Sequence, residues 1–166
     1  MMYFLDFDRT LFDTDAFCAL AQTHPSAADK TFSSNEMLEL HALSLAAGPD
    51  PAQCLYVDVP EFLRALGNEA VIVTFGDPVL QRMKVEKALR GIPRITALYT
   101  GNELKGTFLA SRAMSYGARS IFVDDRPLQL ESVSEHCPAI RVYEMRRDGE
   151  AGDGRWPVVH SLTELP

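Results

Sequence analysis

Five short apolar segments recur along the chain and predict the strands of a β-sheet. They are "MYFLDF" (2–7), "AVIVTF" (70–75), "ITALYT" (95–100), "SIFVDD" (120–125) and "AIRVYEM" (139–145). The first, second and fourth are apolar almost throughout and do not alternate with polar residues. Continuous apolar runs of this kind are typical of strands that helices cover on both faces, as in a parallel sheet.

Segments with helical spacing separate the predicted strands. They include "VPEFLRALG", "DPVLQRMKVEKALRG" and "GTFLASRAMSYGA". Asp77 followed by Pro78 predicts the start of the second, because aspartate caps a helix and proline suits its first turn. Strands that alternate with helices of this length predict an α/β fold with a doubly wound, mainly parallel Rossmann-like sheet.

One segment interrupts this alternation, because about sixty residues separate the first two predicted strands, far more than one crossover needs. "DAFCALAQTH" (15–24) and "SNEMLELHALSLAA" (34–47) both look helical, and the polar loop "PSAADKTFSS" joins them. We therefore expect residues 14–56 to form a small helical cap insertion, and residues 1–13 and 57–166 to form the core domain. Near the C-terminus, "RRDGEAGDGR" is polar and glycine-rich, which predicts an exposed loop.

Length and composition narrow the class of protein. The 166 residues suit one domain that carries a small insertion. No apolar run approaches the roughly 20 residues of a membrane span, and the start of the chain lacks the features of a secretory signal. Three cysteines without metal-type spacing (Cys18, Cys54 and Cys137) favour reduced thiols in a cytoplasmic protein. The net charge of −7 argues against nucleic acid as a partner, and the oligomeric state stays open.

Polar residues gather where three of the predicted strands end. Asp6 and Asp8 follow the first strand, Thr74 ends the second, and Asp124 and Asp125 end the fourth. Ligands of open α/β sheets bind at the carboxyl ends of the strands. A chain that stayed extended through Asp8 would aim both of the first carboxylates to the same side. A single aspartate after a strand is often only a helix cap, but three acids from two strands at one edge favour a site.

The charge of such a cluster predicts its ligand. Two carboxylates about 5 Å apart repel each other by roughly 3 kcal/mol at an effective dielectric constant near 20. A cluster of three would take up protons or recruit a cation. Oxygen ligands with room for water and phosphate suit Mg²⁺, so the sequence predicts a magnesium site.

These residues also resemble a known family. "FLDFDRTLFDT" (4–14) resembles motif I of the haloacid dehalogenase superfamily, which has the pattern DxDx(T/V) after a hydrophobic strand. "VIVTF" with Thr74 resembles motif II, and "FVDD" resembles the acidic pair of motif IV. Lys105 in "NELKGTF" stands where the family carries its motif III lysine. The order and spacing match over nearly the whole chain, and "VVHSLTEL" is similar to the short strand and closing helix of the family.

The resemblance implies a phosphomonoester hydrolase that acts through a covalent intermediate. Asp6 would attack phosphorus and form an aspartyl-phosphate. Asp8 would protonate the leaving oxygen and then deprotonate the water that cleaves the intermediate. Family members that dehalogenate typically lack an acid at this second position, so Asp8 favours phosphoryl transfer.

The resemblance also implies the groups that bind the metal and the phosphate. Mg²⁺ would be held by the Asp6 carboxylate, the Asp8 backbone carbonyl and Asp125, and Asp124 would support the site from behind. Thr74 would offer its hydroxyl to a phosphoryl oxygen. Lys105 would add a positive charge to the transition state.

Two alternatives and several residues stay open at this point. A phosphotransferase or phosphomutase would use the same residues, and a non-catalytic phosphate-binding module would use the same pocket without turnover. The substrate is expected to be a small-molecule phosphate ester of unknown identity. Arg9, where the family often has glycine, is equally well explained as a substrate contact or a surface residue. Asp13 is interpreted as a helix cap, and Lys84 and Lys87 as solvated residues of a helix.

Overall fold

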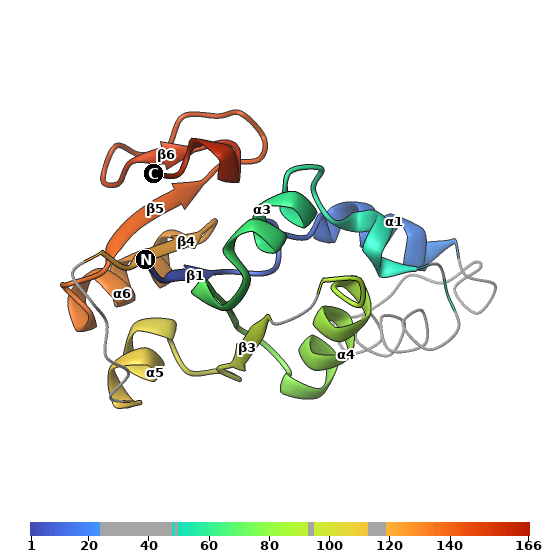
Figure 1. The fold of residues 1–166 in the computed structure, drawn as a ribbon, viewed down its shortest axis with the longest axis horizontal. Coiled ribbons are helices and arrows are strands. Elements are labelled where there is room, and N and C mark those ends of the chain that lie inside the picture. Colours follow the sequence, from blue (N-terminus) through green and yellow to red (C-terminus); the bar gives the residue numbers. More distant parts are fainter. Residues whose placement is uncertain (24–47, 49, 93–94, 113–118) are drawn as a thin grey trace.

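The computed structural model describes residues 1–23, 48, 50–92, 95–112 and 119–166 (Figure 1). The second helix expected in the insertion (34–47) and the loop before it lie outside these ranges. No described helix is long and apolar enough to cross a membrane.

Strands and helices alternate along the described chain, as the sequence predicted. The strands are β1 (Tyr3–Leu5), β2 (Ala70–Thr74), β3 (Thr96–Tyr99), β4 (Ile121–Asp124), β5 (Arg141–Met145) and β6 (Val158–Val159). The α-helices are α1 (Thr14–Gln22), α3 (Val59–Leu66), α4 (Pro78–Ala88), α5 (Lys105–Ser111) and α6 (Pro127–His136). Short 3-10 turns are η2 (Pro51–Cys54), η3 (Gly67–Glu69) and η4 (Leu162–Glu164).

The six strands form one sheet in the order β3-β2-β1-β4-β5-β6, and every pairing between them is parallel. The first strand of the chain therefore lies inside the sheet, with Tyr3 opposite both Ala70 of β2 and Ile121 of β4. Every residue of β1, β2 and β4 is buried. This confirms the doubly wound α/β fold and explains why these three segments are apolar throughout.

Helices cover both faces of the sheet (Figure 1). On one face, Leu63 of α3 and Val85 of α4 pack in a buried cluster with Leu5 and Ile72 of the sheet. On the other face, α5 and α6 pack against Phe4, Val71, Val73 and Phe122. Because alternate residues of a strand point to opposite faces, each buried strand contributes to both clusters. The predicted start of α4 is also confirmed, since the Asp77 carboxylate accepts hydrogen bonds from the backbone N–H groups of Val79 and Leu80.

The described ends of the insertion pack onto the core. Asp13 caps α1 by accepting a hydrogen bond from the backbone N–H of Ala16 at 2.8 Å, which confirms its interpretation as a cap. Phe17 of α1 and Cys54 of η2 are buried in the same cluster as β1. The division into a core and a cap at residues 14–56 stays a prediction, because most of the segment lies outside the described residues.

The loop between β5 and β6 is exposed over most of its length, as expected, but the prediction is wrong for Arg147. The side chain of Arg147 is only 10% exposed and forms an ion pair with Asp58 at 2.9 Å. Its partner lies far away in sequence, so the local composition of the loop gave no sign of this contact.

Candidate active site

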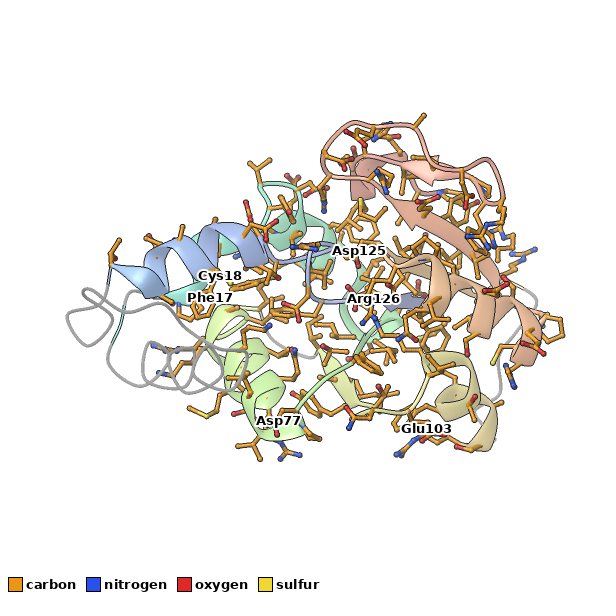
Figure 2. All side chains as sticks on the ribbon, turned by 180° about the vertical axis from the view of Figure 1, so that it is seen from behind. Phe17, Cys18, Asp77, Glu103, Asp125 and Arg126 are labelled. Carbon is orange, nitrogen blue, oxygen red and sulfur yellow. The ribbon has the colours of Figure 1, made fainter. Side chains whose placement is uncertain are left out.

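The carboxyl ends of β1 and β4 lie side by side and bring the two acidic motifs together. Leu5 is opposite Val123 in the parallel register, and the Asp6 backbone N–H donates to the Val123 carbonyl at 2.8 Å. The chain therefore places Asp6 beside Asp124 and Asp125. One carboxylate oxygen from each of these three residues lies within 4.8 Å of the other two. Figure 2 labels Asp125, which lies near the centre of the view, away from the rim where Asp77 and Glu103 lie.

Lys105 is the cation that this cluster already contains. It begins α5 and is completely buried, and its Nζ donates to Asp6 and, at 2.6 Å, to Asp124 Oδ2. Its backbone N–H donates to the side-chain Oε1 of Gln129 at 2.9 Å. Burial would lower the pKa of Lys105, but the charges of Asp124 and Asp6 raise it above the ordinary value of a lysine. The ammonium group is therefore fixed between two acids on different strands.

A glycine allows α5 to approach the neighbouring helix. A Cβ atom at Gly106 would lie 2.0 Å from the Ser132 carbonyl oxygen of α6, far inside van der Waals contact. The absence of a side chain at Gly106 therefore lets α5 begin close enough for Lys105 to reach both acids.

The carboxylate oxygens of the cluster differ in whether they already accept a hydrogen bond. Asp124 uses both, since Oδ2 accepts from Lys105 and Oδ1 accepts the backbone N–H of Arg126 at 2.9 Å. Asp6 uses Oδ1 for Lys105, but its buried Oδ2 has no donor among the described residues. Asp125 is partly exposed and lines the pocket beside Asp6. The pair that faces the pocket is therefore Asp6 and Asp125.

This donor set fits a hard divalent cation. A buried carboxylate oxygen without a partner is unfavourable unless a proton or a cation reaches it. Burial and the nearby charge of Asp124 raise the pKa of Asp6 to about 7. Burial and the charge of Asp6 raise the pKa of Asp125 to about 7 as well. Oxygen ligands on one open side are the arrangement that Mg²⁺ takes when water and phosphate complete its shell.

Asp8 lies in the same pocket but binds a different lysine. The strand ends at Leu5, so the condition of an extended strand through Asp8 is not met, yet Asp6 and Asp8 line the same pocket. Its Oδ1 accepts from Lys84 Nζ at 2.5 Å and from the Thr14 hydroxyl at 2.6 Å, and its Oδ2 accepts from Gln81 at 2.9 Å. Burial would raise the pKa of Asp8, but Lys84, Thr14 and Gln81 hold it below its ordinary value. Both Asp8 oxygens thus have donors, and these donors stabilise the ionised form of the carboxylate.

The interpretation of Lys84 as a solvated residue is wrong. Lys84 is only 4% exposed. Its Nζ lies over the rings of Phe7 and Phe12, 5.7 Å and 5.6 Å from their centroids. The helical spacing contained a signal for this burial. Gln81, Lys84, Val85 and Ala88 recur at intervals of three or four along α4, and all four are buried. Lys87, on the same helix, is partly exposed.

Thr74 ends β2 next to this second group. Its hydroxyl donates to Gln81 Oε1 at 3.1 Å, and the residue is 1% exposed. The wall of the pocket is formed there by Phe75. The structure thus links Thr74 to Asp8 through one shared amide side chain, and its role toward phosphate stays a prediction.

The loop of motif I is held from the far end of the chain by Arg147, a residue that the sequence reading missed. Arg147 donates two hydrogen bonds to the Thr10 carbonyl, from Nε at 3.0 Å and from Nη2 at 2.8 Å. Its guanidinium also pairs with Asp58 and lies 4.4 Å from the ring centroid of Tyr56. Arg147 therefore fixes the backbone just after the acids of motif I.

Arg9 has a backbone that favours glycine. Its φ of 59° is the only positive value among the described residues other than glycine, which fits the resemblance to a family that often has glycine here. The side chain pairs with Asp15 at 2.8 Å.

Two adjoining pockets open at this edge of the sheet. The first, about 320 Å³, contains Asp6, Asp8, Lys105 and Asp125 in its wall. The second, about 840 Å³, extends toward β5 and the start of α6. Arg9, Asp125 and Arg126 belong to both, so the two spaces meet at these residues.

Comparison with known proteins identifies the fold. No protein-family model and no curated protein matches the sequence. YfnB from Bacillus subtilis, described as a HAD-hydrolase and solved bound to magnesium, superposes with a TM-score of 0.69 at 12% identity, over 99% of this chain and 96% of that one. The L-2-haloacid dehalogenase RSc1362 gives a TM-score of 0.63 at 16% identity, over 99% and 96%. A mutant of CbbY from Rhodobacter sphaeroides in complex with xylulose-(1,5)-bisphosphate gives 0.56 at 15% identity, over 99% and 95%.

These similarities extend over almost the full length of each chain, and they agree with the motif order in the sequence. At sequence identities this low, the similarities establish the fold but not the function. The chain therefore has the haloacid dehalogenase-like fold that its motifs predicted.

Proposed function

We propose that this protein is a Mg²⁺-dependent phosphomonoester hydrolase that works through an aspartyl-phosphate on Asp6. The observation that carries the proposal is the buried Asp6 Oδ2, which has no donor among the described residues and belongs to a carboxylate group with Asp125. Lys105 holds the other Asp6 oxygen, so the carboxylate is fixed in orientation while Oδ2 stays without a donor.

The residues support a sequence of two displacements. In the first, an Asp6 oxygen bonds to phosphorus, the bond from phosphorus to the ester oxygen breaks, and Asp8 supplies the proton that the leaving alcohol needs. In the second, Asp8 takes a proton from water, the water oxygen bonds to phosphorus, and phosphate leaves as the Asp6 carboxylate is restored. Lys105 offsets negative charge throughout.

A magnesium ion would be held by Asp6 and Asp125, with Asp124 orienting Lys105 behind them. When bound, it would neutralise charge on the phosphoryl oxygens and lower the repulsion between an anionic nucleophile and an anionic ester.

Asp8 favours this reaction over dehalogenation, which is one of the activities named among proteins of this fold. A halide leaves without a proton, so that reaction has no need of a second acid. Here the second acid is present, and three donors fix its carboxylate and favour the ionised form, the form that accepts a proton from water in the hydrolytic step. Its lowered pKa also means that it must gain a proton before it can act as the acid of the first step.

The direct test is hydrolysis of p-nitrophenyl phosphate and of a panel of natural phosphate esters. We expect turnover with Mg²⁺, none with EDTA, and a loss of at least about 1000-fold for Asp6→Asn, since removing a nucleophile leaves only binding and electrostatics. Asp153→Asn, an exposed acid on the loop before β6, is the matched control and should keep full activity. Undiminished turnover by Asp6→Asn would rule out the mechanism.

The same panel separates the alternatives. Transfer of the phosphoryl group to an added sugar phosphate, faster than to water, would identify a phosphotransferase. Binding of Mg²⁺ and phosphate without turnover of any ester would identify a binding module.

A further inference from the structure

We propose that Arg126 binds a second anionic group of the substrate, one carried by the leaving-group part of the ester. The inference rests on the proposed function and adds a substrate class: phosphate esters whose alcohol part bears a carboxylate or a second phosphate.

The first support is the size and position of the two adjoining pockets. The pocket at the acids is about 320 Å³ and must hold the metal, its waters and the phosphoryl group. The adjoining pocket of about 840 Å³ is in the range that encloses small organic ligands. Arg126 belongs to the wall of both. An ester bound at Asp6 and extending into the larger pocket would therefore pass this side chain.

The second support is the state of the arginines in the larger pocket. Arg9 pairs with Asp15, and Arg147 pairs with Asp58 and the Thr10 carbonyl. Arg146 lies within 4 Å of three carboxylates, those of Glu144, Asp148 and Glu150. These three guanidinium groups are already neutralised by the protein.

Arg126 differs from them, because no carboxylate among the described residues forms an ion pair with its side chain. It is held instead by an aromatic ring, with its guanidinium 5.0 Å from the ring centroid of Phe75. Stacking fixes the plane of a guanidinium and leaves its N–H donors at the edge, where they match the two oxygens of a carboxylate or phosphate. Figure 2 shows Arg126 beside Asp125, just past the end of β4.

The third support is the apolar part of the wall of the larger pocket. Besides the acids Asp13, Asp15, Asp125 and Asp148, this wall contains the apolar surface of Tyr56, Leu128 and Met145, and Leu128 is 52% exposed although it is a large hydrophobic residue. A carbon skeleton with an anion at its far end would contact this surface and the Arg126 donors together.

Matched pairs of esters test the proposal. 3-Phosphoglycerate differs from glycerol 3-phosphate by a carboxylate, and fructose 1,6-bisphosphate differs from fructose 6-phosphate by a phosphate. For wild-type protein with Mg²⁺ we expect kcat/KM to be at least tenfold higher for one of the doubly anionic esters than for its partner. Arg126→Ala should reduce that ratio at least tenfold, mainly through KM, and Arg126→Lys should restore part of it. The pair of esters whose ratio falls in Arg126→Ala shows whether Arg126 binds a carboxylate or a phosphate.

Arg112→Ala is the matched control. Arg112 is also an exposed arginine that stacks on a phenylalanine, with its guanidinium 3.9 Å from the ring centroid of Phe108, but it lies outside both pockets. This variant should keep the wild-type ratio.

Two results would overturn the proposal: an unchanged ratio in Arg126→Ala, or an equal loss on both members of a pair, which would place Arg126 against the transferred phosphoryl group. Calorimetric binding of the same esters to Asp6→Asn with and without Arg126→Ala, in Mg²⁺, repeats the comparison without turnover. It decides the role of Arg126 even if wild-type protein hydrolyses no ester, an outcome that would count against the proposed function alone.

Discussion

Two groups of lysine and aspartate meet at one pocket, where Asp6, Asp8 and Lys105 form part of the wall, and the two groups are in opposite states. Lys105 bridges Asp6 and Asp124, and this group keeps one buried carboxylate oxygen without a donor and an Asp6 pKa raised to about 7. Lys84 pairs with Asp8, whose two oxygens both have donors and whose pKa is lowered.

The difference teaches that burial alone does not decide what an acid does. Asp6 shares one cation with a second acid, so the group retains excess negative charge and favours a further cation. Asp8 has its own cation and two neutral donors, so it is stable as an anion and needs no metal. The group at Asp6 thus favours binding of a metal ion, whereas the group at Asp8 favours an ionised carboxylate.

The largest expected effect comes from removing the shared lysine. Lys105→Met leaves Asp6 and Asp124 buried without their cation, which should cost about 3–5 kcal/mol of unfolding free energy in EDTA. Turnover should fall at least about 100-fold, since a positive group at the reacting centre is lost. Urea unfolding and phosphatase assays measure both effects. Lys87→Met, on the partly exposed part of α4, is the control. Wild-type stability in Lys105→Met would contradict the shared-cation account.

The next largest effect is expected from Gly106→Ala, which displaces Lys105 without replacing it. Gly106→Ala brings a Cβ to within 2.0 Å of the Ser132 carbonyl, so α5 must shift from α6. We expect a loss of about 3 kcal/mol, as for overpacked cores, with lower activity because Lys105 moves too. Gly91→Ala, where a Cβ meets nothing within 4 Å, should be nearly neutral. Equal thermal stability of the two variants would show that the helix contact is not restrictive.

Removing the lysine of the second pair should cost less. Lys84→Met leaves Asp8 with Gln81 and Thr14 as donors, so we expect a loss of about 2 kcal/mol, that of one hydrogen bond to a charged group. The Asp8 pKa should rise, because its main stabilising charge is gone. The unfolding free energy in urea and the acid limb of the kcat profile measure these changes. A larger loss of stability than in Lys105→Met would reverse the ranking of the two pairs.

The smallest expected effect uses an ion pair outside the smaller pocket, Asp58 with Arg147, as a reference. Burial would raise the pKa of Asp58, but hydrogen bonds from Arg147, Leu162 and Ser161 hold it below its ordinary value. Because the folded-state pKa lies below the unfolded one, the pair stabilises the protein above about pH 4 and this contribution is lost as the pH falls further. Asp58→Asn should therefore cost about 1 kcal/mol at pH 7 and flatten the decline of thermal stability below pH 4. If the thermal stability of Asp58→Asn fell below pH 4 as steeply as that of the wild type, the lowered pKa of Asp58 would be contradicted.

The sequence predicted the fold because its strongest signals are local. Three apolar runs without alternation predicted strands buried on both faces, and β1, β2 and β4 are such strands. The same logic placed Asp6, Asp124 and Asp125 together, because the carboxyl ends of neighbouring parallel strands meet at one edge.

The residues that the sequence reading missed depend on partners far away in the chain. Lys84 is charged and sits mid-helix, so its type suggested solvent, and only its spacing with Gln81, Val85 and Ala88 indicated burial. Arg147 lies in a glycine-rich loop, and its partners Thr10 and Asp58 become neighbours only after the sheet has formed. Neither pairing leaves a local pattern.

The place of β1 inside the sheet has a consequence for how the protein is made. Its two neighbours, β2 and β4, come much later in the chain, with Ala70 and Ile121 both opposite Tyr3. During synthesis on the ribosome, Asp6 therefore emerges long before the strand that brings Asp124 and Asp125 to it. Such distant pairings slow folding and leave hydrophobic strands uncovered for a time, so the nascent chain should depend on chaperones until β4 has emerged.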